Sequence, residues 1–303
     1  MAIFFAQNGF LLVFSLSSLL TQPCLTSPIT GNKQTTLTNN TITYSDEFSF
    51  SCLPLITQVS DPIFSPGRES LHTHVVTGGT AFQRTMGMQT ARNAHETTCE
   101  AVYYLNRACS YAPGARECPN GVYPLAPPAG LRVVAGNPML QTYNDSDIAQ
   151  RAISHMCIGK NGKLRSQVFF PSCWDGKNLD SPDHKSHLAY PAIGDYNKGV
   201  CPESHPIAIF SIFFEFIFNT EPFPDYQNLL YASGDRTGYG LHGDFINGWT
   251  DQVALHSAFE TCTGKGWLAV APLSLKAEVT LPWAELGQNR TIPVLPGHPE
   301  HAY

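Results

Sequence analysis

The pattern of hydrophobic and polar positions along the chain predicts a succession of short strands. Residues 71–76 alternate around two histidines, residues 131–135 are short and β-branched, and residues 166–170 end at a proline. Residues 206–218 are apolar on both faces, which is typical of a central strand covered on both sides. Many short strands joined by turns indicate a mostly β, single-domain β-sandwich or jelly-roll-like fold with long loops.

The composition agrees with this fold class and excludes some functions. The chain has 24 Gly and 23 Pro, which favour turns, and at 43% hydrophobic it can build a sizeable core. Helical spacing is weak and confined to residues 147–156 and 251–262, so we expect few short helices. A net charge of −6 without a long basic stretch argues against a nucleic-acid partner held by phosphate contacts.

The N-terminus has the pattern of a secretory leader. Residues 10–20 are apolar, residues 21–27 are a polar exit, and the first charged side chain is Lys33. We therefore expect residues 1–27 to be a signal peptide, with an uncleaved anchor as the alternative. No later segment approaches about 18 apolar residues. The mature chain is then expected to be secreted and extracellular, without membrane contact.

The rest of the chain shows no internal repeat or linker that would divide it. Residues 28–50 are rich in Thr, Asn and Ser and are expected to be a flexible lead-in, and residues 51–303 a single globular, monomeric domain. Eight cysteines follow the expected cleavage point, and in an oxidising compartment they predict four bridges of open pairing. These cysteines are Cys52, Cys99, Cys109, Cys118, Cys157, Cys173, Cys201 and Cys262. Glycosylation sequons occur at Asn39, Asn144 and Asn289.

Three stretches bring histidines together with carboxylates. Side chains two apart on a strand share a face, so His72 and His74 point the same way, and so do His242 and Asp244. Imidazoles on one β face can bind a metal or act as an acid/base pair; the alternative is hydrogen bonding within the fold. Glu215 is the one charged residue in the apolar strand. It either faces a cleft as a general acid or forms a buried ion pair.

Residues 169–191 form the densest polar segment, in which a strand ends at a proline and a Cys-anchored loop follows. Loops held by a rigid scaffold often carry sites. Trp174 offers a flat apolar face for a sugar ring, and the polar set offers hydrogen bonds to hydroxyls. A solvated loop with internal salt bridges is the alternative. The candidate binding residues are Trp174, Asp175, Lys177, Asn178, Asp180, Asp183, His184 and Lys185, together with Asp244 from the later strand, and His187 is a candidate acid or base.

Four segments together resemble a known family. They are residues 61–67 with His72-Thr-His74 and Gly78-Gly79, residues 169–191, residues 201–206 and residues 234–249. Over residues 60–297 the chain resembles the fungal secreted domain-of-unknown-function family numbered one-nine-nine-six. The resemblance implies an extracellular fungal glycoprotein, in relatives sometimes beside carbohydrate-binding modules of the WSC type, and no established activity. The chain departs from the family after Met86, where a Cys- and Trp-containing segment is missing.

These observations lead to one leading hypothesis and two alternatives. The leading hypothesis is a secreted carbohydrate-active enzyme that degrades a cell-wall polysaccharide. Its acid/base groups would be His72, His74, His187, Glu215 and His242, and its partner a glycan. The first alternative is a non-catalytic polysaccharide-binding protein that uses the same groove. The second is a metal-dependent hydrolase with His72, His74, His242 and Asp244 as ligands. No phosphate-loop, dinucleotide or nucleophile-elbow motif appears, so no organic cofactor is expected.

Overall fold

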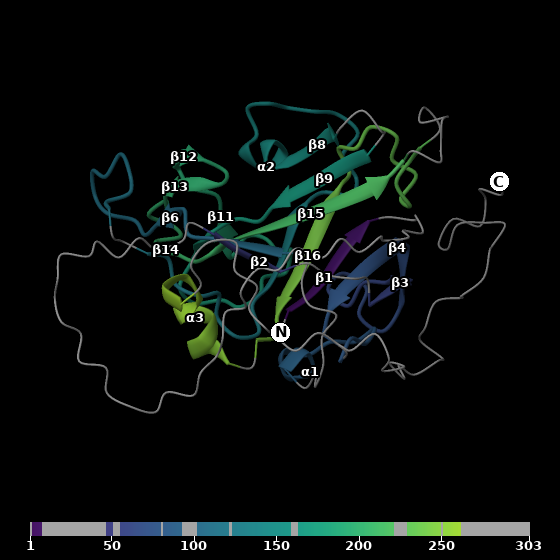
Figure 1. Cartoon of the computed structure of the whole chain (residues 1–303), viewed down its shortest axis with the longest axis horizontal. Helices are drawn as coiled ribbons and strands as arrows, with labels where there is room; N and C mark the ends of the chain where they lie inside the picture. Colours follow the sequence, from purple (N-terminus) through teal and green to yellow (C-terminus); the bar gives the residue numbers. More distant parts are fainter. Residues whose placement is uncertain are drawn as a thin grey trace.

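A computed structural model describes residues 2–7, 47–50, 55–79, 81–92, 102–120, 123–158, 163–220, 229–249 and 251–261. The mostly β, disulfide-stapled fold predicted from the sequence is confirmed, with two five-stranded antiparallel sheets and two three-stranded sheets in this part of the chain. Figure 1 shows β15 and β9 of one large sheet crossing over β16 of the other.

The first large sheet has the order β3-β4-β1-β16-β7. Its strands are β3 (Ile56–Ser60), β4 (Glu69–Gly78), β1 (Ala2–Gln7), β16 (His242–Asn247) and β7 (Arg132–Gly136). β1 lies between β4 and β16 and pairs antiparallel with both. Residues 2–7 fall within the expected signal peptide, so here the structure gives that segment a place in the sheet.

The second large sheet has the order β2-β5-β15-β9-β8. Its strands are β2 (Glu47–Phe50), β5 (Val102–Leu105), β15 (Ser211–Asn219), β9 (Lys163–Phe169) and β8 (Ile153–Ile158). β15 is the central strand that the apolar run predicts. The run is interrupted, however, because Ile207–Ala208 forms β14 of a separate small sheet. β2 lies within the expected flexible lead-in.

Short elements complete the described fold. The small sheets combine β10 (Cys173–Trp174), β11 (Leu188–Ala189) and β14, and β6 (Ala108–Cys109), β12 (Ile193–Asp195) and β13 (Lys198–Val200). The helices are α1 (Met88–Arg92), α2 (Ile148–Arg151) and α3 (Gln252–Thr261). The helical spacing predicted over residues 147–156 is correct only for α2, because the chain continues as β8. No described helix is long and apolar enough to cross a membrane.

One core packs between the two large sheets. Val133 and Phe245 contribute from the first sheet, and Tyr104, Val168 and Phe214 contribute from the second. A side chain at position 243 would lie 3.1 Å from the rings of Phe170 and Phe214, so glycine allows β16 to approach the opposite sheet closely. The outer face of the first sheet carries a second cluster. Val76, Val134 and Ile246 of the sheet pack there with Ile63, Phe82, Met86 and Ala91.

The cysteines only partly follow the expected framework. Cys109 is bonded to Cys118 and Cys173 to Cys201. Cys157 is an exposed free thiol, which corrects the expectation that all eight form bridges. Cys52, Cys99 and Cys262 lie outside the described residues.

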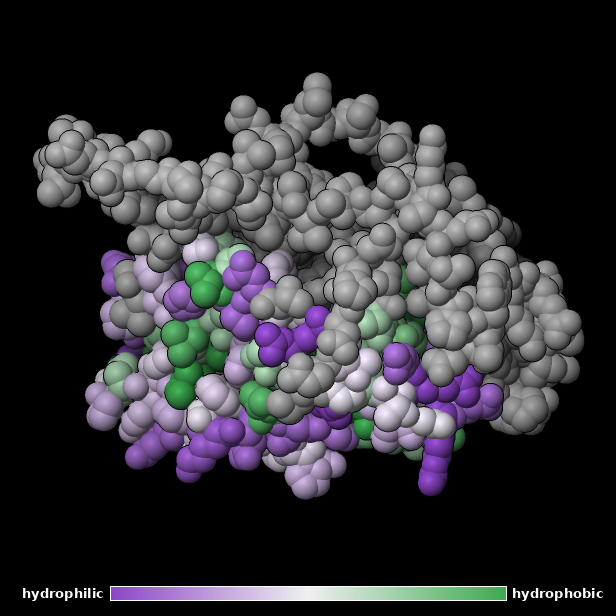
Figure 2. All heavy atoms as spheres, turned by 90° about the horizontal axis from the view of Figure 1, so that it is seen from below, coloured by the Kyte–Doolittle hydropathy of each residue, from purple (hydrophilic) through white to green (hydrophobic). Residues whose placement is uncertain are grey.

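On the face drawn in Figure 2, hydrophobic residues form small patches separated by hydrophilic ones.

Candidate metal centre

Three buried imidazoles converge on the outer face of the first sheet. His72 and His74 extend from β4, and His242 extends from the first position of β16. The Nε2 atom of His242 lies 3.2 Å from Nε2 of His72 and 3.4 Å from Nε2 of His74. Zinc–nitrogen bonds of 2.0–2.1 Å at tetrahedral angles separate ligand nitrogens by about 3.3 Å. The spacing therefore matches ligands arranged around one ion.

Hydrogen bonds turn two of these rings toward the centre. Nδ1 of His242 lies 3.3 Å from the carbonyl of Gly240, and Nδ1 of His74 lies 3.4 Å from Oγ of Ser70. Ser70 in turn donates to the carbonyl of His72. When Nδ1–H donates to such an acceptor, the lone pair of Nε2 faces inward, as in known metal sites.

Two carboxylates border the three histidines. Oδ2 of Asp244 lies 3.8 Å from Nε2 of His74, and neither oxygen of Asp244 has a hydrogen-bond partner among the described residues. Asp61 lies at the same place, so that Asp61, His74 and Asp244 form a second group able to hold a metal ion. Oδ1 of Asp61 already accepts from the backbone N–H groups of Ile63 and Phe64, at 2.8 and 2.9 Å. A buried carboxylate without partners requires protonation or a cation.

The electrostatics of this centre favour a bound cation. Burial lowers the pKa of His242 to about 3 and that of His74 well below its usual value, and His72 lowers both further. Burial raises the pKa of Asp244 well above its usual value; Asp61 adds to the rise, whereas Lys185 opposes it. His74 and His242 are therefore neutral, as metal ligands must be, and Asp244 would be stabilised as an anion by a metal ion.

The backbone opposite His242 must be glycine. Gly136 of β7 pairs with His242 and has a φ of +85°. A side chain there would lie 2.4 Å from the carbonyl oxygen of Leu241 and 2.9 Å from Cα of His242. Any larger residue would therefore push β16 and displace the ring of His242.

In the first half of the polar loop predicted to bind substrate, the polar groups form hydrogen bonds with one another. Oδ1 of Asp175 accepts from the backbone N–H groups of Lys177 and Asn178, and the Trp174 indole donates to the Asn178 carbonyl at 2.6 Å. The Trp174 side chain also packs against the main core. These residues shape the loop, and Trp174 does not present an open platform.

The second half of the loop docks on the edge strand β7. Asp180 lies 3.7 Å from the guanidinium of Arg132 and 2.6 Å from Nδ1 of His184. Nε2 of His187 lies 2.6 Å from the Arg132 carbonyl, and its Nδ1 lies 2.8 Å from Oγ of Ser181. Because both nitrogens of His187 contact the protein, the structure gives His187 a role in attaching the loop and does not bring it to the three-histidine centre.

Glu215 also lies elsewhere. It belongs to β15 of the second sheet, and its carboxylate accepts from Arg165 of β9 at 2.9 Å. Of the two alternatives weighed from the sequence, the structure therefore shows the partly buried ion pair.

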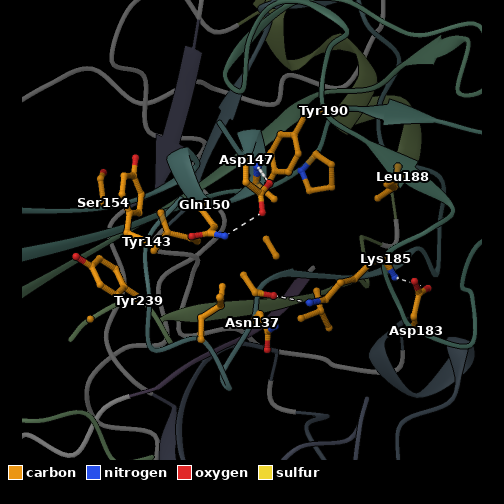
Figure 3. A pocket seen from close by; sticks show the side chains of 18 of the residues that line it. Asn137, Tyr143, Asp147, Gln150, Ser154, Asp183, Lys185, Leu188, Tyr190 and Tyr239 are labelled. Carbon is orange, nitrogen blue, oxygen red and sulfur yellow. Dashed lines mark hydrogen bonds between the residues drawn. The ribbon is translucent and has the colours of Figure 1, made fainter. Parts of the chain in front are cut away.

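A pocket that the sequence did not indicate lies beside Lys185 and Asp183. It has a volume of 680 Å³, and its other lining residues include Asn137, Tyr143, Asp147, Gln150 and Tyr239. Figure 3 shows Tyr143 and Tyr239 at one end and Lys185 with Asp183 at the other. Lys185 donates to the carbonyl of Gly136, so one strand separates this pocket from His242.

The fold and these side chains define a disulfide-stapled β domain with a buried set of metal-type donors. Residues 100–249 match a family described as "Domain of unknown function (DUF1996)", which confirms the family expected from the sequence segments. The matched range includes His242 and Asp244, whereas Asp61, His72 and His74 precede it. No curated protein and no solved structure gave a significant match.

Proposed function

We propose that this protein is a metal-dependent hydrolase whose ion is held by His72, His74 and His242. The observation that carries the proposal is the pair of Nε2–Nε2 distances, 3.2 and 3.4 Å, that join His242 to the buried imidazoles of His72 and His74. Nε2 of His242 lies beside two ring nitrogens, those of His72 and His74. A ring nitrogen carries either one hydrogen or one lone pair, so it can form a hydrogen bond with only one of them. An ion at the centre would use all three lone pairs.

The role of Asp244 distinguishes a structural metal site from a catalytic one. As a fourth ligand it would close a tetrahedral site, as in structural zinc sites. As a neighbour it would accept a proton from a metal-bound water, whose pKa an ion such as Zn²⁺ lowers to about 7. We favour the catalytic arrangement because Asp61 supplies a second carboxylate at the same place, more donors than a closed site needs. Of the three histidines, His72 has the largest exposed fraction, 8%.

The test combines metal content with activity. Purified protein should contain about one equivalent of metal by mass spectrometry of the element, and His242→Ala should contain almost none. Hydrolysis of wall polysaccharides should require the metal and should stop when it is chelated. Glu215→Gln is the matched control and should keep both the metal and the activity. Full metal content in His242→Ala would refute the centre, and metal binding without hydrolysis across a broad glycan panel would leave a structural ion.

We also propose an extracellular location. Two disulfide bonds among the described residues are typical of an oxidising compartment. Residues 10–20 have the pattern of a leader, but removal of residues 1–27 would also remove β1 from the first sheet, so the proposal rests on the disulfide bonds. Recovery of the protein from the medium of a eukaryotic host, with N-terminal sequencing to establish whether residues 1–27 are removed, tests this proposal.

A further inference from the structure

The pocket beside Lys185 has the features of a ligand site of its own. At one end, the rings of Tyr143 and Tyr239 are stacked, with centroids 5.6 Å apart and planes at 26°. Both rings remain exposed, at 49% and 39%. Large apolar rings that stay exposed beside a concave polar surface are typical of binding sites. The volume of 680 Å³ is within the range of small-molecule pockets.

The two tyrosines stand on loops that the protein holds rigidly. Before Tyr239, Asp235 accepts from the backbone N–H of Thr237 at 2.7 Å and from that of Gly240 at 2.8 Å. After Tyr143, the side chain of Gln150 accepts from the backbone N–H of Asn144 at 2.8 Å. Two loops far apart in the sequence are therefore fixed independently, and the aromatic pair is formed before a ligand arrives.

The charged groups of the pocket are already compensated within the protein. Asp183 accepts from the backbone N–H and hydroxyl of Ser186, at 2.9 and 2.8 Å, and Asp147 caps α2 through the N–H of Ala149. Lys185 donates to the carbonyl of Gly136 and lies close to Asp183 and Asp244. An ionic ligand would find no uncompensated opposite charge among these residues. A neutral ligand would instead meet amide and carboxylate oxygens able to accept from hydroxyls.

We propose that this pocket binds an uncharged sugar ring, with Tyr143 and Tyr239 as the stacking surface. A pyranose has an apolar C–H face and a rim of hydroxyls. The first would meet the tyrosine pair, and the second the polar side chains that line the same pocket, among them Asn137, Gln150 and Lys185 (Figure 3). The aromatic surface predicted at Trp174 is thus supplied by two other residues. None of the proposed metal ligands is among the residues that line the pocket, so sugar binding does not require the ion, although Lys185 lies close to Asp244.

Direct binding measurements test the inference on the full chain. All proteins carry Asn144→Gln, because a host glycan at this sequon would sit next to Tyr143. Calorimetric or NMR titration should show binding of neutral hexamers of glucose or N-acetylglucosamine. Tyr143→Ala and Tyr239→Ala should each weaken it about tenfold, and Tyr143→Phe should retain it. Tyr123→Ala, at an exposed tyrosine outside the pocket lining, is the matched control and should not change it.

Two further arms separate this inference from the metal proposal. Chelated protein and the His242→Ala variant should bind the neutral hexamers as tightly as the untreated protein, whether or not hydrolysis occurs. Oligogalacturonate and glucosamine hexamers, which are anionic and cationic, should bind more weakly. No binding of either neutral hexamer by folded protein, tighter binding of a charged hexamer, or unchanged affinity in both tyrosine-to-alanine variants would overturn the inference.

Discussion

Replacing Asp244 with asparagine should change the stability of the metal-free and metal-bound protein in opposite directions. The Asp244 carboxylate is fully buried, and neither oxygen has a hydrogen-bond partner among the described residues. A buried unsatisfied polar group costs about 1–3 kcal/mol, but asparagine keeps that cost, so it cancels in the comparison. Because burial raises the pKa of Asp244 well above its usual value, the metal-free wild type at pH 7 must take up a proton or bury a charge, at about 1.4 kcal/mol for each pH unit by which the pKa is raised, up to pH 7. Asp244→Asn keeps the shape and avoids this cost, so the metal-free variant should be more stable than the wild type at pH 7.

The bound metal reverses this order. A metal ion at 100 times its dissociation constant stabilises the wild type by about 2.7 kcal/mol. For a domain of this size that is a rise of about 5–10 °C in Tm. Asp244→Asn should show a much smaller rise, because the charge that attracts the ion is gone.

Differential scanning fluorimetry with and without Zn²⁺, at equal protein concentration, measures both effects. Glu215→Gln serves as the control and should shift like the wild type, because it changes a carboxylate in the other sheet. A metal-free Asp244→Asn protein that is less stable than the wild type, or an equal metal-induced rise in both proteins, would refute the reasoning.

Three further predictions concern the rest of the fold. Replacing both Cys173 and Cys201 by alanine should lower the unfolding free energy by about 3.6 kcal/mol, and replacing both Cys109 and Cys118 by about 2.6 kcal/mol. The first bridge costs more to lose because it closes a loop of 28 residues, whereas the second closes a loop of 9. Equal losses in denaturant unfolding would contradict this. Deleting residues 2–7 would leave the backbone groups of β4 and β16 that face β1 without their hydrogen-bond partners. The unfolding free energy should therefore fall by about 5 kcal/mol or more. An unchanged urea unfolding curve would show that β1 does not contribute to stability. Relative to metal-free His242→Ala, in which Asp244 and His74 still titrate, the metal-free protein should lose stability as the pH falls from about 6.5 toward 3, by about 1.4 kcal/mol per pH unit, because the folded pKa of His242 lies near 3 and only the unfolded chain takes up the proton. A stability difference between the two proteins that does not change over this window would contradict the burial of a neutral ring.

Much of the fold follows from local sequence patterns. Alternation around His72 and His74 predicted β4, and the apolar run predicted the central position of β15. The same rules placed His242 and Asp244 on one strand face, now seen in β16. Periodicity could not show that β4 and β16 lie in one sheet, because strand order depends on long-range pairing.

The errors also have physical causes. Glu215 is as isolated in the sequence as a catalytic acid would be, and its partner Arg165 comes from a neighbouring strand that the pattern does not reveal. His187 lies in a loop of reactive side chains, yet those side chains satisfy one another and the edge of β7. Tyr143 and Tyr239 gave no signal because single tyrosines in loops are common, and their stacking exists only in three dimensions.

The position of β1 sets the distance between the two strands that carry the histidines. His72 and His74 lie on one side of β1 and His242 on the other. Neighbouring strands are about 4.8 Å apart, so the two sets of ligands project from backbones about 10 Å apart, a width that two facing imidazoles can bridge. If β4 and β16 paired directly, that backbone separation would be halved and the rings would have to tilt differently to reach one ion. The metal affinity of a chain that lacks residues 2–7 would therefore report how much the spacing set by β1 contributes to the geometry of the centre.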